Sequence, residues 1–127
     1  MVLKKASEKA RKFVEDRGWS DYHHPKELSI KLVLEAAELL DLFEWMNEEE
    51  VKKAMKNEEF KKAIEDEVAD IFTILLQFSH NVDVDIMDAF IQKQADSEKR
   101  FPVEKAKKFD PVDWKLKKLR EKNKTSL

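Results

Sequence analysis

Apolar residues recur every three or four positions along most of this chain, which is the spacing of amphipathic helices. The first such stripe predicts a helix over residues 3–17, and Gly18 suits the left-handed position that ends it. After a loop over residues 19–26, Pro25 suits the start of a second helix, which the pattern extends to about Met46. The stripe of this second helix consists of Leu28, Leu32, Leu39, Leu42, Phe43 and Met46.

Polar capping residues predict where the later helices begin. Asn47 and Glu50 form a capping-box pair that starts a short charged helix, and Asn57 can cap a long helix over about 58–79. Asp85 suits the N-cap of a fourth long helix, which ends near Arg100 because Pro102 follows.

Composition supports an all-α fold of one domain. The 127 residues include one glycine, three prolines and 41% charged side chains, so the turn residues that hairpins need are scarce. We expect a four-helix-bundle-like catalytic domain over residues 1–102, with extra short helices, followed by a C-terminal segment over 103–127. Without cysteine, disulfides, thiolate metal ligands and thiol nucleophiles are excluded.

The charge of the chain is divided unevenly. Residues 1–102 carry a net charge of −7, and residues 103–127 carry +5. A basic segment can attract nucleic acid, but apolar residues alternate with its lysines at helical spacing, which favours packing on its own domain or on a partner subunit. They are Phe109, Val112, Trp114, Leu116 and Leu119. No signal peptide or membrane span is visible, so a cytoplasmic protein is expected.

Two pairs of carboxylates interrupt the most apolar stretches. Glu35 and Glu38 lie within 32–40, and Glu67 and Asp70 lie within 67–72. Residues three apart share one helix face, so two antiparallel helices would direct four carboxylates into one pocket. Because buried carboxylates need compensation and oxygen ligands suit hard cations, this pattern predicts Mg²⁺, or alternatively Mn²⁺, with a phosphate ester or anhydride as substrate.

The carboxylates allow two other interpretations. They could be solvated faces of amphipathic helices, although the apolar neighbours argue against this. A di-iron bundle would show Glu-x-x-His, and neither glutamate has a histidine three residues later.

At these positions the chain resembles the MazG-like all-α nucleoside triphosphate pyrophosphatase superfamily, whose hallmark is Glu-x-x-Glu, a spacer and Glu-x-x-Asp. Residues 17–25, 42–45, Lys93 and 100–102 look like its dCTP pyrophosphatase branch. The resemblance implies Mg²⁺-dependent hydrolysis to a nucleoside monophosphate and pyrophosphate, in a homodimer or homotetramer. It implies that all four carboxylates hold the metal and that Glu35 or Glu38 assists as a base.

The same resemblance suggests which residues contact the nucleotide. Trp19 and Trp45 would enclose the base, and His23 would lie near the nucleotide. Lys93, Ser97 and Arg100 share one face of the fourth long helix and could meet the triphosphate. The dCTP branch tends to have Asn in place of Ser97 and Asp in place of Ala95. The alternative function is a non-catalytic helical module that binds nucleotide or protein, and a purely structural dimerisation module is a third reading.

Overall fold

The computed structural model describes residues 2–125, which contain helices and no strand, so the all-α prediction is confirmed. The helices are α1 (Val2–Asp16), the 3-10 turn η1 (Ser20–Tyr22), α2 (Pro25–Asp41), α3 (Glu48–Ala54), α4 (Glu58–Asn81), α5 (Ile86–Arg100), α6 (Val103–Ala106) and α7 (Pro111–Thr125). None of the described helices combines the length and apolar character that a membrane span requires.

The chain folds as two compact units, and each is considered by itself. The first ends at Ile86 and the second begins at Met87. The division of the sequence into a catalytic domain over 1–102 and a C-terminal segment over 103–127 stays a prediction.

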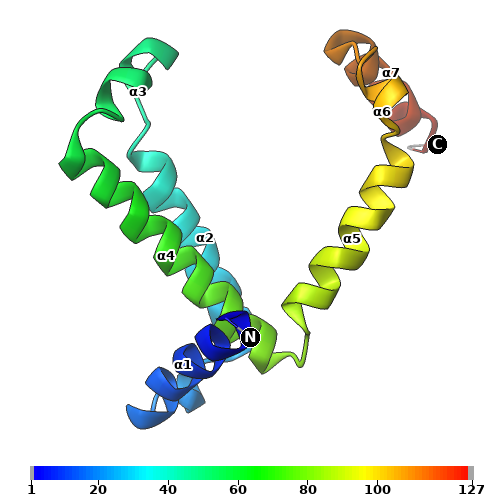
Figure 1. Cartoon of the computed structure of the whole chain (residues 1–127). Helices are drawn as coiled ribbons and strands as arrows, with labels where there is room; N and C mark the ends of the chain where they lie inside the picture. The colour runs from blue at the N-terminus through cyan, green and yellow to red at the C-terminus, as the bar shows by residue number, and fades with distance from the viewer. Residues whose placement is uncertain (1, 126–127) are drawn as a thin grey trace. The chain divides into compact units, whose positions relative to one another are not determined.

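An antiparallel hairpin of α2 and α4 forms the frame of the first unit. The two helices lie side by side, α3 connects them at one end, and α1 packs on α4 near the other end (Figure 1). The side-chain amide of Asn81, at the end of α4, donates a hydrogen bond to the His23 carbonyl just before α2, at 2.7 Å. This bond ties the open end of the hairpin together.

The end of α1 and the starts of α2, α3 and α4 follow the expected signals. Gly18 has φ of 66° just after α1, and Pro25 is the first residue of α2. Asn47 and Glu50 form the complete capping box of α3, while Asn57 accepts a hydrogen bond from the Phe60 amide at the start of α4.

The second long helix ends earlier than the sequence pattern predicts. It stops at Asp41, and residues 42–45 form turns in which Trp45 has φ of 70°. The apolar spacing persists through this turn because Leu42, Phe43 and Met46 are still half-buried. Periodicity alone therefore did not reveal where the backbone leaves the helix.

The core of the first unit is small, whereas the exposed apolar surface is large. Among the residues that the structure describes, four apolar side chains are buried, and Leu28 is the most enclosed at 1% exposure. The others are Val14, Ile74 and Leu76. In contrast, α2 carries a second apolar stripe that faces away from the packed one and stays exposed: Ile30, Val33, Leu34 and Leu40. A helix that is apolar on two faces is normally covered on both.

The second unit consists of α5, α6 and α7. The rings of Phe109 and Trp114 meet edge to face at 6.0 Å, and the Lys118 ammonium lies 4.5 Å from the Trp114 ring centre. The side chains of residues 98–124 are exposed. The packing of this segment on its own domain or on a partner subunit stays a prediction.

Candidate active site

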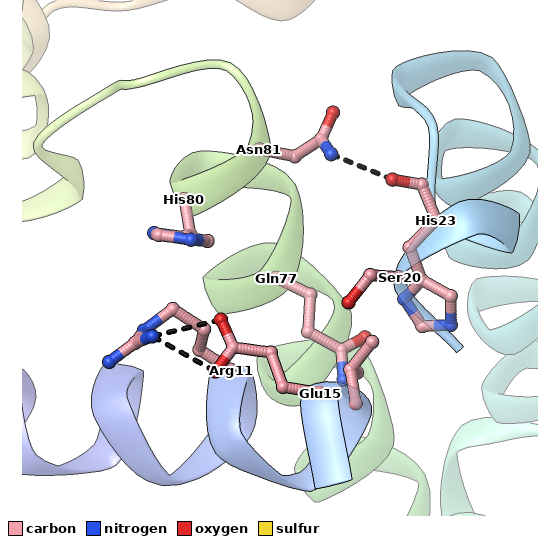
Figure 2. Close-up of a pocket in the computed structure, with 8 residues that line it drawn as sticks. Arg11, Glu15, Ser20, His23, Gln77, His80 and Asn81 are labelled. Atoms are coloured by element: carbon pink, nitrogen blue, oxygen red, sulfur yellow. Dashed lines mark hydrogen bonds and ion pairs between the residues drawn. The ribbon is translucent and has the colours of Figure 1, made fainter. Parts of the chain in front are cut away.

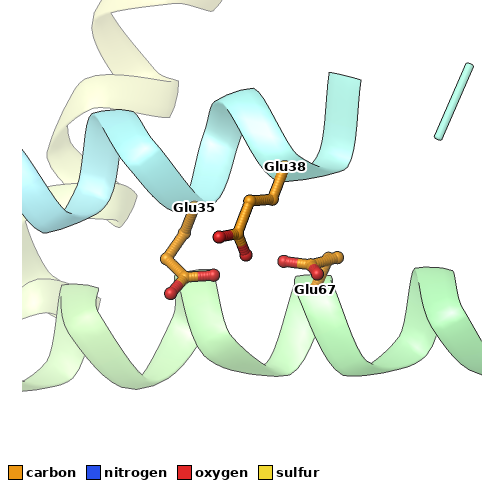
Figure 3. A group of neighbouring side chains, drawn as sticks. All are labelled: Glu35, Glu38 and Glu67. Carbon is orange, nitrogen blue, oxygen red and sulfur yellow. The ribbon is translucent and has the colours of Figure 1, made fainter. Parts of the chain in front are cut away.

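Three glutamates from the α2–α4 hairpin converge on one point. Glu35 and Glu38 extend from α2, and Glu67 extends from α4 toward them (Figure 3). One carboxylate oxygen from each residue lies within 4.8 Å of the others. The arrangement brings together three of the four carboxylates that the sequence pattern singled out.

The register of the two helices explains this convergence. Glu35 follows Leu28 and Leu32 at helical spacing, so it occupies a position of the stripe by which α2 packs on α4. Glu67 has the same relation to Phe60 and Ile64 on α4. Both glutamates therefore stand at positions where an apolar residue would ordinarily fill the seam between two helices.

Burial differs among the four carboxylates. Glu35 and Glu67 are half-buried, while Glu38 and Asp70 are exposed. The expectation that apolar neighbours leave all four poorly solvated thus fits the two residues in the seam. Asp70 lies outside the three-glutamate cluster, but its negative charge is close enough to raise the pKa values of both seam glutamates.

The cluster makes ionisation of Glu35 and Glu67 unfavourable. Burial, followed by the charge of Glu38, raises the pKa of Glu35 to about 7. Burial and the charge of Glu38 also raise the pKa of Glu67. The protein scaffold thus holds like charges together at a cost that a bound cation would remove.

Unsatisfied oxygen atoms also fit a metal ion. Oε2 of Glu35 and Oε2 of Glu67 are buried, and neither has a hydrogen-bond partner among the described residues. Such atoms are rare unless a ligand completes them. A set of carboxylate oxygens without imidazole or thiolate suits Mg²⁺ or Mn²⁺ better than zinc.

A cavity of about 200 Å³ adjoins this cluster and contains groups suited to a nucleotide. Glu35 and Asp70 line it together with Trp19, His23 and Lys31. Trp19 packs edge to face against Phe13, which also lines the cavity, with ring centres 5.8 Å apart. An aromatic wall, a cation and carboxylates therefore share one cavity.

The surroundings of His23, which lines this cavity, favour its neutral form. Burial, followed by the positive charge of Lys31, lowers the pKa of His23. Its Nδ1 atom is buried and has no hydrogen-bond partner among the described residues. A neutral imidazole can both donate and accept a hydrogen bond to a sugar or base.

The remaining predicted contacts are not among the residues that line this cavity. Trp45 is 92% exposed and does not line the cavity. Its positive φ is costly for a residue with a large side chain, and such strain is often found at functional sites. Lys93, Ser97 and Arg100 lie on α5 in the second unit, so their approach to a triphosphate stays a prediction.

Sequence reasoning missed two residues of the cavity that carry useful chemistry. Lys31 precedes Glu35 by one helical turn, so helical spacing could have placed it beside the carboxylates. Gln77 lies two turns after Asp70 on α4. The sequence indicates Gln77 less clearly, because an isolated glutamine in an apolar helix is more easily interpreted as a surface residue.

Comparisons with known proteins agree with this geometry. Residues 30–123 match the MazG-like family. The chain is 31% identical over 91 residues to dCTP pyrophosphatase 1 of Bos taurus, and 27% identical over 95 residues to the same enzyme of Homo sapiens. These alignments cover 72% and 75% of this chain, but 54% and 56% of the relatives. The chain thus spans about half the length of the curated relatives that it matches.

A solved structure supports the same assignment. A pyrophosphatase from Archaeoglobus fulgidus superposes with a TM-score of 0.75 at 28% sequence identity, covering 80% of this chain and 94% of that one. The fold and the cluster define an all-helical protein with an acidic site between two antiparallel helices. The chain belongs to the MazG-like family. The matched region includes the four carboxylates and the predicted α5 contacts, whereas Trp19 and His23 precede it.

Proposed function

We propose that this protein is a Mg²⁺-dependent nucleoside triphosphate pyrophosphatase that acts on the cytoplasmic nucleotide pool. It would hydrolyse a ribo- or deoxyribonucleoside triphosphate to the monophosphate and pyrophosphate. The observation that carries the proposal is the convergence of Glu35, Glu38 and Glu67 beside a cavity with an aromatic wall and a lysine. The relatives named dCTP pyrophosphatase 1 make nucleotides the natural substrate class to test.

The three glutamates, joined by Asp70, would hold the metal. When bound, Mg²⁺ supplies Lewis-acid stabilisation of the phosphate charge and lowers the pKa of water. In the reaction, water adds to phosphorus and the bond to the bridging oxygen between the α and β phosphates breaks. Glu35 or Glu38 would accept a proton from the attacking water at a carboxylate oxygen.

The other cavity residues would bind and orient the nucleotide. The Lys31 ammonium would compensate phosphate charge beside the carboxylates. Trp19 offers an indole surface for stacking, and His23 offers a neutral ring for hydrogen bonding. Trp45, exposed at the end of the hairpin, would become a second aromatic contact if another copy brings a site to it.

We further propose that the working form is a homodimer or homotetramer. The exposed apolar stripe of α2 supports this, because Ile30, Val33, Leu34 and Leu40 lie on one face and are exposed. Val68 and Phe72, one turn apart on α4, are also exposed. A second copy could cover these faces, and assembly could bring Lys93, Ser97 and Arg100 to a triphosphate.

Product analysis tests the proposed reaction. The purified protein is incubated with Mg²⁺ and a panel of ribo- and deoxyribonucleoside triphosphates, and the products are separated chromatographically. We expect monophosphate and pyrophosphate from the wild type and none from Glu38→Ala. Glu27→Ala is the matched control, because Glu27 is an exposed glutamate on the same helix outside the cluster.

Other products would contradict the proposal in specific ways. Diphosphate and phosphate would mean that a different bond is cleaved. If no nucleotide is hydrolysed with Mg²⁺ but nucleotides still bind, the non-catalytic binding module becomes the better account. An active Glu38→Ala variant would remove the three-glutamate cluster from the reaction.

A further inference from the structure

A second cavity is also lined by His23, but neither Glu35 nor Asp70 lines it. It encloses about 310 Å³ between the C-terminal half of α1, η1 and the end of α4 (Figure 2). His23 and Gln77 line both this cavity and the one beside the carboxylates. The two cavities therefore adjoin, with these side chains between them.

The position of Gln77 along α4 suits the far end of a nucleotide. Asp70 and Gln77 both line the cavity beside the carboxylates and are seven residues apart, which corresponds to about 10 Å along a helix. This separation is comparable to the length of a nucleoside monophosphate. With the phosphates at the carboxylates, the base would reach Gln77.

The charges of the second cavity argue against a phosphate site. The Arg11 guanidinium binds both carboxylate oxygens of Glu15, at 2.9 and 3.1 Å, so these two charges compensate each other. Burial lowers the pKa of His23 and so favours the neutral ring there. A cavity with compensated charges and several polar groups fits a neutral polar ligand better than an anion.

The polar groups between the cavities still have bonding capacity. Nδ1 of His23 is buried without a partner among the described residues. The half-buried Gln77 side chain offers an amide N–H donor and a carbonyl acceptor. Asn81 donates to the His23 carbonyl at 2.7 Å and so acts as a positioning residue for the histidine.

We propose that Gln77, together with His23, recognises the hydrogen-bonding edge of the nucleobase and that the second cavity accommodates this edge. The inference rests on the proposed function and deepens it, because it assigns base selection to a residue away from the metal ligands. An amide pairs with both donors and acceptors, so a base whose edge matches its orientation is favoured over one that leaves the amide unpaired.

The test compares kcat/KM for the common deoxynucleoside triphosphates in the wild type and in Gln77→Met. Methionine has a similar length but lacks the amide. We expect the ratio between the best and the poorest base to fall about tenfold, the effect of one lost hydrogen bond. The Mg²⁺ dependence should be unchanged, since Gln77 is not in the carboxylate cluster.

Two further variants make the result specific. Gln77→Glu retains the size but removes the N–H donors, so it should shift preference toward bases that present amino groups. It also serves as the second variant if Gln77→Met does not fold, as judged by circular dichroism. Gln94→Met is the matched control, because Gln94 is exposed on α5 and should leave the base ratio unaltered.

The outcomes separate this inference from the proposed function. If the wild type hydrolyses nucleotides but both Gln77 variants change kcat/KM by the same factor for every base, Gln77 is only structural and the inference is wrong. The inference is equally wrong if the Gln77 variants leave kcat/KM unchanged for every base. If the wild type hydrolyses no nucleotide, the proposed function itself fails and this inference fails with it.

Discussion

Glu35 of α2 and Glu67 of α4 face each other across the seam of the helical hairpin, and each has a buried Oε2 atom that no described donor reaches. Apolar side chains surround them along the same stripes, so the pair occupies positions where leucine or isoleucine would stabilise the fold more. This arrangement makes the metal-free protein less stable, as is expected of a binding site.

Magnesium should stabilise the fold through this cluster. At one hundred times its Kd, a ligand specific for the folded state contributes about 2.7 kcal/mol to the free energy of unfolding. We expect Mg²⁺ to raise the melting temperature of the wild type and to have little effect on Glu67→Gln. The measurement is differential scanning calorimetry with and without Mg²⁺.

The matched control for this experiment is Glu65→Gln. Glu65 is an exposed glutamate two residues away on α4, outside the cluster. This variant loses one negative charge outside the site but retains the three-glutamate cluster, so it should keep the full Mg²⁺ response. If Glu67→Gln responded as strongly as this control, the ion would bind elsewhere.

The metal-free protein should lose stability as pH rises. The pKa of Glu35 is raised to about 7 in the folded state, above the ordinary value of 4.5. Between these two values the folded state binds more protons than the unfolded state, so the free energy of unfolding falls as pH increases. The contribution of Glu35 is fully present below about pH 4.5 and is lost as pH passes through about 7.

Urea denaturation in the presence of a chelator measures this dependence. We expect the slope between pH 5 and 7 to be smaller in Glu35→Gln, because the amide does not ionise. Added Mg²⁺ should offset the loss at the upper end of the range, since it favours the ionised carboxylates. A wild-type slope equal to that of Glu35→Gln would show that Glu35 titrates normally.

The sequence allowed the helices and the carboxylates to be predicted for a shared physical reason. Helical spacing fixes which residues lie on one face. Glu35 continues the spacing of Leu28 and Leu32, so its side chain had to point into the packed stripe. The caps at Asn47 and Asn57 were equally local signals. Local rules were enough because each of these features depends on neighbours along the chain.

Features that depend on distant segments were not predictable in the same way. The cavity at His23 requires the end of α4 to meet the loop before α2, and the Asn81 bond to the His23 carbonyl joins residues 58 positions apart. Gln77 lines this cavity only because these distant segments pack together. The early end of α2 was missed because Leu42 and Phe43 remain half-buried in the following turns.

Leu28 should be the most sensitive position of the small core. It is 1% exposed, and truncation of a buried leucine to alanine typically costs about 2–5 kcal/mol. We expect Leu28→Ala to reduce the free energy of unfolding by an amount in this range, measured by urea denaturation in Mg²⁺. Val2→Ala is the control, because Val2 is 84% exposed and little is lost there. Equal effects of the two substitutions would mean that Leu28 is not in the stabilising core.

The exposed stripe of α2 should hold copies of the chain together. Val33 and Leu40 are each 68% exposed and lie two turns apart on one helix face, where solvent contact is unfavourable for both. A glutamate at Val33 would place a charge in the centre of the face that we propose a second copy covers, and burying an unpaired charge strongly opposes association. We therefore expect Val33→Glu to convert the wild-type oligomer to a monomer, as measured by size-exclusion chromatography with light scattering.

Asn123→Glu adds the same charge at an exposed site on α7 and should leave the mass of the oligomer unchanged. A wild type that is monomeric at all concentrations, or a Val33→Glu variant that assembles as the wild type does, would mean that something other than a second copy covers this stripe.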